Sequence, residues 1–503
     1  MSFPSDGWRS ARSRRHYPVG GRPRPVDAPP EVAPTQPAPS RSARRQLAAA
    51  PPAARASSAA ASQRPSIREL WRLMTEGVEW TAVYIGFLIY IFVATTYRVP
   101  IGDVAVAFAV VGLLVQRNPM RFPPLLAWFG AFIIWGVLGW AQSQYREAVF
   151  ERLVDLGKLW IIVLVAVNAL RTRAQLRFFI LFFLACYAFY PVRGSYFNYF
   201  LYNSSMSGRA IWNYIYGNPN DLATLTLLAL AICAGVLFTE REKVIRTAAL
   251  VGVGMLTLLV FMTQSRGGIL ALAVFALFTL KNSKRQQRVR TAILFLVVAG
   301  VIAMFAPSKV WDRVKALQNV TNTDNLRAVD QEGSAEQRYE IWKVARKIIR
   351  EHPVFGVGVG AYADTHHDYA LRSEFKKTAQ GHRDTHSTYL NVAAETGIVG
   401  LAIFLGMFGT LGRYAERVRR RARAVMPDVA QQILFLELGL VAFFAAGLFG
   451  SYGHLNFTYI YSALLAAYLY VTEQDLAGVY GVRGAGFAPP GPGAGRRVVR
   501  GRA

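Results

Sequence analysis

The chain has 503 residues, of which 53% are hydrophobic and only 17% are charged. Soluble domains carry about 25% charged residues, so the composition argues against an ordinary soluble protein. The net charge of +27 could indicate nucleic-acid binding, but the basic residues lie in short loops and in the two tails. That distribution is typical of membrane topology and disfavours a nucleic-acid-binding protein.

The two ends of the chain differ in composition from the rest. Residues 1–65 are rich in Arg, Pro, Ala and Ser, and they lack the apolar core of a signal peptide. This segment can bury too little apolar surface to fold, so we predict a disordered tail. We predict the same for residues 473–503, which end in a cluster of arginines.

Between these tails, apolar runs of about 17–22 residues recur, each long enough to cross a hydrocarbon core about 30 Å thick. The sequence therefore predicts an all-α membrane protein with about twelve transmembrane helices. Helices one to nine fall in residues 66–306 and helices ten to twelve in residues 397–472. A large, partly helical loop, residues 307–396, separates helices nine and ten. The expected helix centres are Phe87, Phe108, Phe132, Ile162, Phe183, Leu230, Gly254, Val274, Val298, Leu405, Leu440 and Leu465.

Basic residues alternate with these expected spans. The loops at 116–121, 171–177, 239–246, 281–290 and 413–423 are rich in Lys or Arg, whereas the loop at 450–454 has neither. The positive-inside rule then places the basic loops and both termini in the cytoplasm, and the 307–396 loop outside it. The cysteines, Cys186 and Cys233, each lie inside an apolar run, which excludes a disulfide framework or a sulfur-ligated zinc site.

The 307–396 loop carries signals of local structure. Ser334 and Gln337 form a capping box, which predicts a helix to about Arg350 with an apolar face. This helix would lie either in the membrane–water interface or against the protein's own helices. Pro353 ends it, and three glycines at 356, 358 and 360 follow, which indicate a turn rather than a nucleotide-binding loop.

Histidines gather on the non-cytoplasmic side of this topology, and His386 is the best placed of them for catalysis. Asp384 or Thr385 is a suitable N-cap and Gly397 a suitable C′ residue, which puts His386 in the first turn of a short helix. The helix dipole would keep the imidazole neutral, so it could act as a general base; a structural histidine is the alternative. The other histidines on this side are His352, His366, His367, His382 and His454.

A metal site is a competing interpretation of the same loop. The chain has no fixed metalloenzyme spacing such as H-E-x-x-H, so we expect no metal ion. The residues that could supply oxygen and nitrogen ligands are His366, His367, Asp368, His382, Asp384 and His386.

Three arginines, Arg209, Arg266 and Arg338, also fall on the outer side, against the topological bias. A guanidinium group binds phosphate through paired hydrogen bonds, so these residues are candidates for binding an anionic substrate. The alternative for Arg266, at a helix end, is a side chain that reaches for the membrane surface.

These segments together resemble the O-antigen ligase and polymerase superfamily of bacterial envelope glycosyltransferases. The family usually has Asn, Ser or Gln after its histidine, and Ser387 fits this pattern. The resemblance covers roughly residues 209–400. It rests on His386-Ser387-x-x-Leu390 with Gly397-x-x-Gly400, Gly217-Asn-Pro-Asn-Asp-Leu-Ala223, Ser265-Arg266-Gly267, Arg338-x-x-x-Trp342, and Pro353 with Gly356, Gly358 and Gly360.

The resemblance implies transfer of a glycan from undecaprenyl diphosphate to an acceptor hydroxyl in the bacterial inner membrane, at its periplasmic face. The reaction would invert the sugar and need no metal and no cofactor. His386 would be the base, and Arg266, Arg209 and Arg338 would bind the diphosphate. The supporting residues would be Ser265, Ser387, Asn220, His382 and Asp384.

The acceptor cannot be read from the sequence. We favour an O-antigen ligase, whose acceptor is a lipid A–core sugar, over a polymerase of O-antigen or exopolysaccharide and over a protein O-oligosaccharyltransferase. A transporter or lipid-linked glycan flippase is the alternative of a different class. It would predict ionisable residues at helix midpoints and repeated halves with broken helices, and the sequence shows no convincing repeat.

Overall fold

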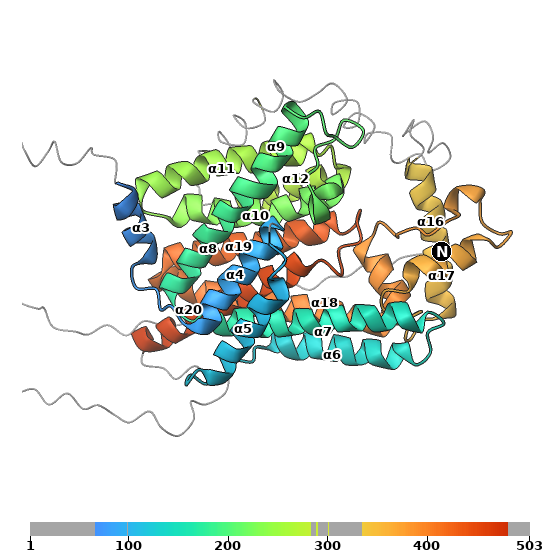
Figure 1. Cartoon of the computed structure of the whole chain (residues 1–503), viewed down its shortest axis with the longest axis horizontal. Coiled ribbons are helices and arrows are strands. Elements are labelled where there is room, and N and C mark those ends of the chain that lie inside the picture. Colours follow the sequence, from blue (N-terminus) through green and yellow to red (C-terminus); the bar gives the residue numbers. More distant parts are fainter. Residues whose placement is uncertain (1–65, 98, 283–287, 290–299, 301–333, 481–503) are drawn as a thin grey trace, which may run out of the picture. The chain divides into compact units, whose positions relative to one another are not determined.

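Helices form nearly all the regular structure of the chain. The computed structural model describes residues 66–97, 99–282, 288–289, 300 and 334–480, all of which belong to one unit, Pro65–Ala503. No strand occurs within these ranges, so the described chain confirms the all-α class (Figure 1). The helices are α3 (Ile67–Thr75), α4 (Ala82–Thr96), α5 (Gly102–Val115), α6 (Pro124–Trp140), α7 (Arg146–Ala169), α8 (Arg173–Tyr187), η2 (Ala188–Val192), α9 (Arg193–Phe200), η3 (Tyr214–Gly217), α10 (Pro219–Thr239), α11 (Lys243–Met262), α12 (Arg266–Asn282), α16 (Ser334–Glu351), α17 (Tyr362–Ala370), η6 (Lys377–Ala379), α18 (Thr388–Val425), α19 (Pro427–Ala446) and α20 (Asn456–Tyr480).

A helix covers every expected centre except Val298, which lies outside the described residues. Within those residues, five segments are long and apolar enough to cross a membrane: Arg173–Phe200, Pro219–Thr239, Lys243–Met262, Thr388–Val425 and Pro427–Ala446. Three shorter apolar helices are α4, α5 and α6. The chain is thus an integral membrane protein by the character of its helices, while the count of twelve spans and their orientation remain predictions.

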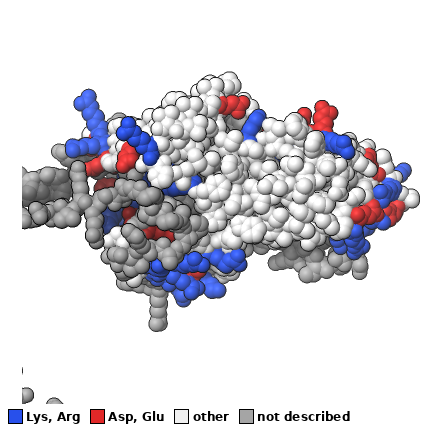
Figure 2. All heavy atoms as spheres, turned by 90° about the horizontal axis from the view of Figure 1, so that it is seen from below, with Lys and Arg blue, Asp and Glu red and all other residues white. Residues whose placement is uncertain are grey.

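The surface agrees with a membrane environment. On the face seen in Figure 2, charged side chains gather toward the two ends, and the broad area between them carries few of them. Large apolar side chains such as Val104, Phe108, Leu114 and Ile134 are exposed on α5 and α6. In water such a surface would be costly, whereas in hydrocarbon it is the favourable one.

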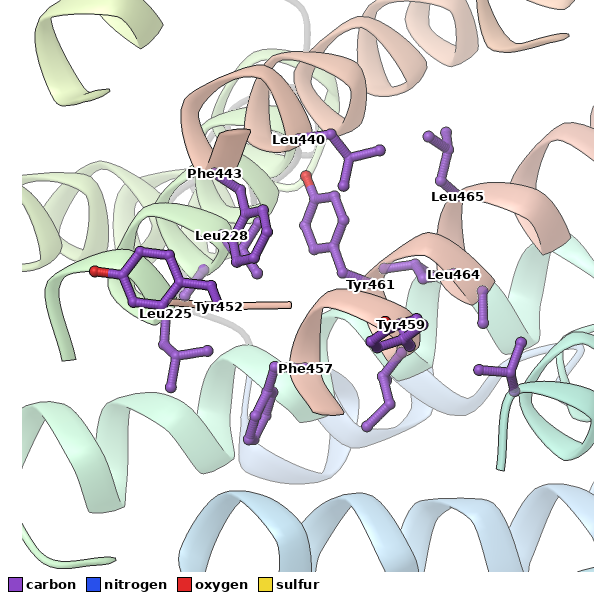
Figure 3. Close-up of a cluster of buried hydrophobic side chains, with 14 of the residues drawn as sticks. Leu225, Leu228, Leu440, Phe443, Tyr452, Phe457, Tyr459, Tyr461, Leu464 and Leu465 are labelled. Atoms are coloured by element: carbon purple, nitrogen blue, oxygen red, sulfur yellow. The ribbon is translucent and has the colours of Figure 1, made fainter. Parts of the chain in front are cut away.

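The core of the bundle is built around α10. In the apolar 18-residue stretch of α10 that could cross a membrane, 83% of the residues are buried inside the protein. This helix packs against α11 and α19. Figure 3 shows Leu225 and Leu228 of this helix beside Phe443 of α19 and Phe457 of α20. Because lipid gives helices no hydrophobic reason to associate, close packing of this kind is what holds them together.

The helix that carries Arg338, α16, packs against the protein itself. Ile341 is 1% exposed, and Val344, Ala345 and Ile348 are not exposed. Their partners are α17, α18 and η6. The expected apolar face is confirmed, and of the two expected locations the structure shows packing on the protein's own helices. The capping box rests on the side chain of Ser334, which lies outside the described atoms.

The glycine-rich segment after Pro353 fits between two helices. Gly356 has φ +69°, and a β-carbon there would collide with the backbone of Glu395 and Thr396 in α18. Gly397 has φ +71° and ψ −178°, which interrupts α18, and the amide of the next residue, Ile398, donates to the Pro353 carbonyl at 2.8 Å. Gly397 therefore ends a short helix as predicted, and the reason is close backbone packing, because only glycine adopts this conformation readily.

The C-terminal boundary differs from the expected one. The sequence places the start of a tail at residue 473, whereas α20 continues to Tyr480. Ion pairs and a hydrogen bond hold the additional turns: Glu473 lies 3.6 Å from Arg421, Asp475 lies 2.5 Å from Arg173, and Gln474 accepts from Arg121 at 3.0 Å. These contacts come from distant parts of the chain, so composition alone could not show them.

Candidate active site

His386 lies at the end of an irregular segment that is fixed from several sides. Thr385 donates through Oγ1 to the Ser387 carbonyl at 2.8 Å, and its hydroxyl lies 2.8 Å from that of Ser451. The indole of Trp342 in α16 donates to the Thr385 carbonyl at 2.8 Å. His386 itself has φ +50°, a strained value for a residue with a β-carbon. Strain of this kind persists only where surrounding contacts impose it, and it is common at functional sites.

The predicted position of His386 in the first turn of a helix is wrong, because the helix begins two or three residues later than expected. The helix begins at Thr388 with Ser387 as N-cap, so neither Asp384 nor Thr385 caps it and His386 precedes it. The physical reason is tertiary: the Thr388 amide donates to the Gly447 carbonyl at 2.8 Å, which fixes where the helix can start.

The imidazole of His386 is nevertheless held toward its neutral form. Burial, and next the Arg338 guanidinium, lower the pKa of His386, while the Asp384 carboxylate acts in the opposite direction. A neutral imidazole can accept a proton, as a general base must. The expected protonation state is therefore supported, but its causes are burial and an arginine rather than a helix dipole.

Arg209 and Asn220 form a second part of the site. The Arg209 Nε donates to the Thr263 carbonyl and Nη2 to Asn220 Oδ1, both at 2.8 Å. Asn220 is in the first turn of α10, two residues after the N-cap Asn218. These two bonds hold the guanidinium between the start of α10 and the end of α11.

Arg266 opens α12 directly beyond this point. The hydroxyl of Ser265 accepts from the Gly268 amide at 3.2 Å, as an N-cap does. A β-carbon on Gly267 would lie 2.8 Å from that of Phe449, whose carbonyl accepts from Arg338 Nη1 at 3.4 Å. The start of α12 therefore lies beside the residue that contacts Arg338, which brings the three predicted arginines into one region.

One further polar residue joins this region, and the sequence did not single it out. Tyr452 donates through its hydroxyl to the Asn220 carbonyl at 3.3 Å. Burial chiefly, and also the carboxylates of Asp221 and Asp384, raise the pKa of Tyr452, and Arg338 opposes them. Tyr452 thus lies among the charges of Asp221, Asp384 and Arg338. Its signal in the sequence is Gly450-Ser-Tyr-Gly-His454, a polar segment between two apolar runs.

His382 contacts two residues of α17. Its Nδ1 lies 3.1 Å from Asp364 Oδ1, and its ring stacks on that of His367 at 4.4 Å. Burial lowers the pKa of His366 to about 4, and its Nδ1 contacts the Gly381 carbonyl at 3.2 Å. Among the described residues, no three His, Cys, Asp or Glu side chains are placed so that they could share a metal ion.

Comparison with known proteins agrees with this arrangement. A family model, Wzy_C, described as O-Antigen ligase, matches residues 250–405. The match includes Arg266, Arg338 and His386, whereas Arg209 and Asn220 precede it. A search of curated proteins finds no match to this chain. The resemblance to the O-antigen ligase and polymerase superfamily is therefore confirmed over residues 250–405, the part of the chain that matches the O-antigen ligase model.

Proposed function

We propose that this protein transfers a glycan from undecaprenyl diphosphate to an acceptor hydroxyl at the outer leaflet, with inversion and without a metal ion. As acceptor we propose a lipid A–core sugar. The observation that carries the proposal is the position of His386. Burial and the nearby Arg338 lower the pKa of its imidazole, and both residues lie in the segment that matches the O-antigen ligase model.

The proposed reaction is a single displacement. The acceptor oxygen attacks the anomeric carbon of the donor sugar, and the bond from that carbon to the diphosphate oxygen breaks. His386 accepts the hydroxyl proton, and undecaprenyl diphosphate leaves with the bonding electron pair. A positioned base of suitable pKa contributes about 10²–10⁴-fold to such a step.

Arg209, Arg266 and Arg338 would stabilise the charge that develops on the leaving diphosphate. Donors that are already oriented need no reorganisation during the reaction, which makes them effective. Arg209 is oriented in this way by Thr263 and Asn220, and Arg338 by the Phe449 carbonyl. Arg338 would then have two roles, since together with the larger effect of burial it lowers the pKa of His386.

A groove beside the site suits the polyprenyl chain of the donor. It has a volume of about 630 Å³ and lies between α12, α18, α19 and α20, with mostly apolar residues along it. Its lining includes Tyr389, in the first turn of α18 after His386, and Gly409 and Gly412 further along that helix. A β-carbon at either glycine would meet no described atom within 4 Å, so these positions keep the groove open.

The test uses purified protein in lipid nanodiscs with an undecaprenyl-diphosphate glycan. Candidate acceptors are lipid A–core, a second lipid-linked glycan and a Ser/Thr peptide, each with and without chelator. We expect release of undecaprenyl diphosphate and glycosylated lipid A–core. Loss of this product in His386→Ala, with activity retained in His352→Ala, would support the role of His386 as the general base. His352 is a suitable control because it is exposed and its ring contacts the Tyr369 hydroxyl.

Other outcomes would contradict the proposal. Full turnover in both His386→Ala and Arg266→Ala would refute the mechanism. Loss of turnover with chelator would require a metal ion. Product only with the lipid-linked glycan or only with the peptide would replace the ligase by a polymerase or a protein glycosyltransferase.

A further inference from the structure

A second cavity lies on another side of the bundle and shares no residue with the candidate active site. Its volume is about 490 Å³, and it is open to the outside and lined by the α4–α5 hairpin, by α7 and by the start of α20. Its polar lining consists of Asp103, Arg152, Asp155, Lys158, His454 and Asn456, and its apolar lining of Tyr90, Val106, Leu156, Leu159, Ile161 and Ile162.

The charged groups of this cavity balance in number, and Arg152 and Asp155 form a long ion pair. Arg152 and Lys158 contribute two positive charges, and Asp103 and Asp155 two negative ones. Arg152 Nη1 lies 3.8 Å from Asp155 Oδ2, which is too long for a hydrogen bond. Two positive and two negative charges around a space of this size suit a ligand that itself carries both a positive and a negative charge.

The Arg152 side chain is anchored at its base. A β-carbon on Gly360 would lie 2.8 Å from Cβ of Arg152 and 3.1 Å from its Cγ, so the glycine-rich segment packs on this stem. The stem is therefore fixed by packing, and the guanidinium extends toward the cavity that it lines. A fixed arginine loses less freedom when it binds an anion than a mobile one does.

His454 adds a buried polar atom at the same cavity. Its Nε2 lies 2.8 Å from the Glu395 carboxylate, while its Nδ1 is buried and has no hydrogen-bond partner among the described atoms. A buried polar atom without a partner costs about 1–3 kcal/mol, so a ligand that supplies one is favoured. The carboxylate contact fixes the ring and leaves Nδ1 for such a ligand.

We propose that this cavity binds the head group of a phospholipid that carries a phosphate and a primary ammonium group, as phosphatidylethanolamine does. The phosphate would contact Arg152 and Lys158, and the ammonium group would donate to Asp103, Asp155 and the Nδ1 of His454. The apolar lining would contact the start of the acyl chains. A choline head group has no N–H to donate, and a glycerol head group has no positive charge. Neither can therefore bond to the two basic and the two acidic residues at the same time.

The test compares three lipids with identical acyl chains. Purified protein is mixed with equal amounts of phosphatidylethanolamine, phosphatidylcholine and phosphatidylglycerol, and bound lipid is counted by native mass spectrometry. We expect the ethanolamine lipid to be retained about tenfold better than the others, the effect of one charge-assisted hydrogen bond. Equal retention of all three would overturn the proposal.

Two variants make the test specific. Asp103→Asn removes one acceptor of the ammonium group, so the preference should shift toward phosphatidylglycerol, and Arg152→Gln should lower retention of both lipids. The matched control is Glu151→Gln, which removes a charge from the same helix but does not line the cavity. If Asp103→Asn behaved like Glu151→Gln, the proposal would be wrong. Equally tight binding of soluble phosphoethanolamine would refute the assignment to a lipid.

Discussion

Asn220 offers a sharp test of how the diphosphate site is built. In Asn220→Ala the Arg209 Nη2 loses its acceptor at 2.8 Å, while its bond to the Thr263 carbonyl remains. A hydrogen bond to a charged group is worth about 1.5–3 kcal/mol, which corresponds to roughly 10- to 100-fold in rate. We expect kcat/KM for the lipid-linked donor to fall by about this factor, and KM for the acceptor to stay unchanged.

Asn218→Ala is the matched control. Its Oδ1 accepts from the Asn220 amide at 2.8 Å and caps α10, so its loss should lower stability by about 1 kcal/mol without touching Arg209. Initial rates at varied donor concentration and thermal melting of both variants separate the two effects. The proposed role of Asn220 would be refuted if Asn220→Ala retained its donor kcat/KM, or if Asn218→Ala lost as much of it.

Three further changes test other parts of the site. In Arg338→Gln the pKa of His386 should rise, because a positive charge beside the imidazole is removed. Activity needs the neutral imidazole, so as the pH is lowered the variant should lose activity at a higher pH than the parent protein does. An unchanged acidic limb of the pH–rate profile would contradict this. Gly412→Leu should raise KM for the long-chain donor about tenfold, the effect of losing roughly two buried methylene contacts, whereas Gly254→Leu, at another open position on α11, should leave it unchanged. Gly397→Ala should lower stability in thermal melting by about 1–3 kcal/mol, because its φ of +71° is tolerated by glycine, and an effect no larger than that of Gly254→Ala would show that the interruption of α18 is not strained.

The helices were largely predictable because the signal for them is local. Apolar runs of sufficient length give the centres of the helices, and no distant contact is needed to recognise them. The end of α20 shows the limit, since ion pairs from Arg173 and Arg421 extend it past the point where composition changes. A boundary set by tertiary contacts leaves no trace in a hydropathy pattern.

The residues that lie together in the candidate site were predicted better than their local geometry. Histidine and arginine types in the outer loops indicated a base and an anion site, and the structure places Arg338 where it influences His386. The start of the helix after His386 was misplaced because Ser387, Thr385 and Asp384 are all residues that cap helices. Only the Gly447 carbonyl, which accepts from the Thr388 amide, decides between them.

The turn between α19 and α20 connects the parts of the site that the sequence presents separately. The Phe449 carbonyl accepts from Arg338, the Ser451 hydroxyl contacts Thr385, and the Tyr452 hydroxyl donates to the Asn220 carbonyl. In the sequence this turn was informative only because it contains no Lys or Arg. Its position is nevertheless central, because one short segment bonds to α16, to the His386 segment and to α10. A change in this turn should therefore disturb base and diphosphate site together, as should a change at Arg338, whereas a change at Thr385 or at Asn220 should disturb only one of them.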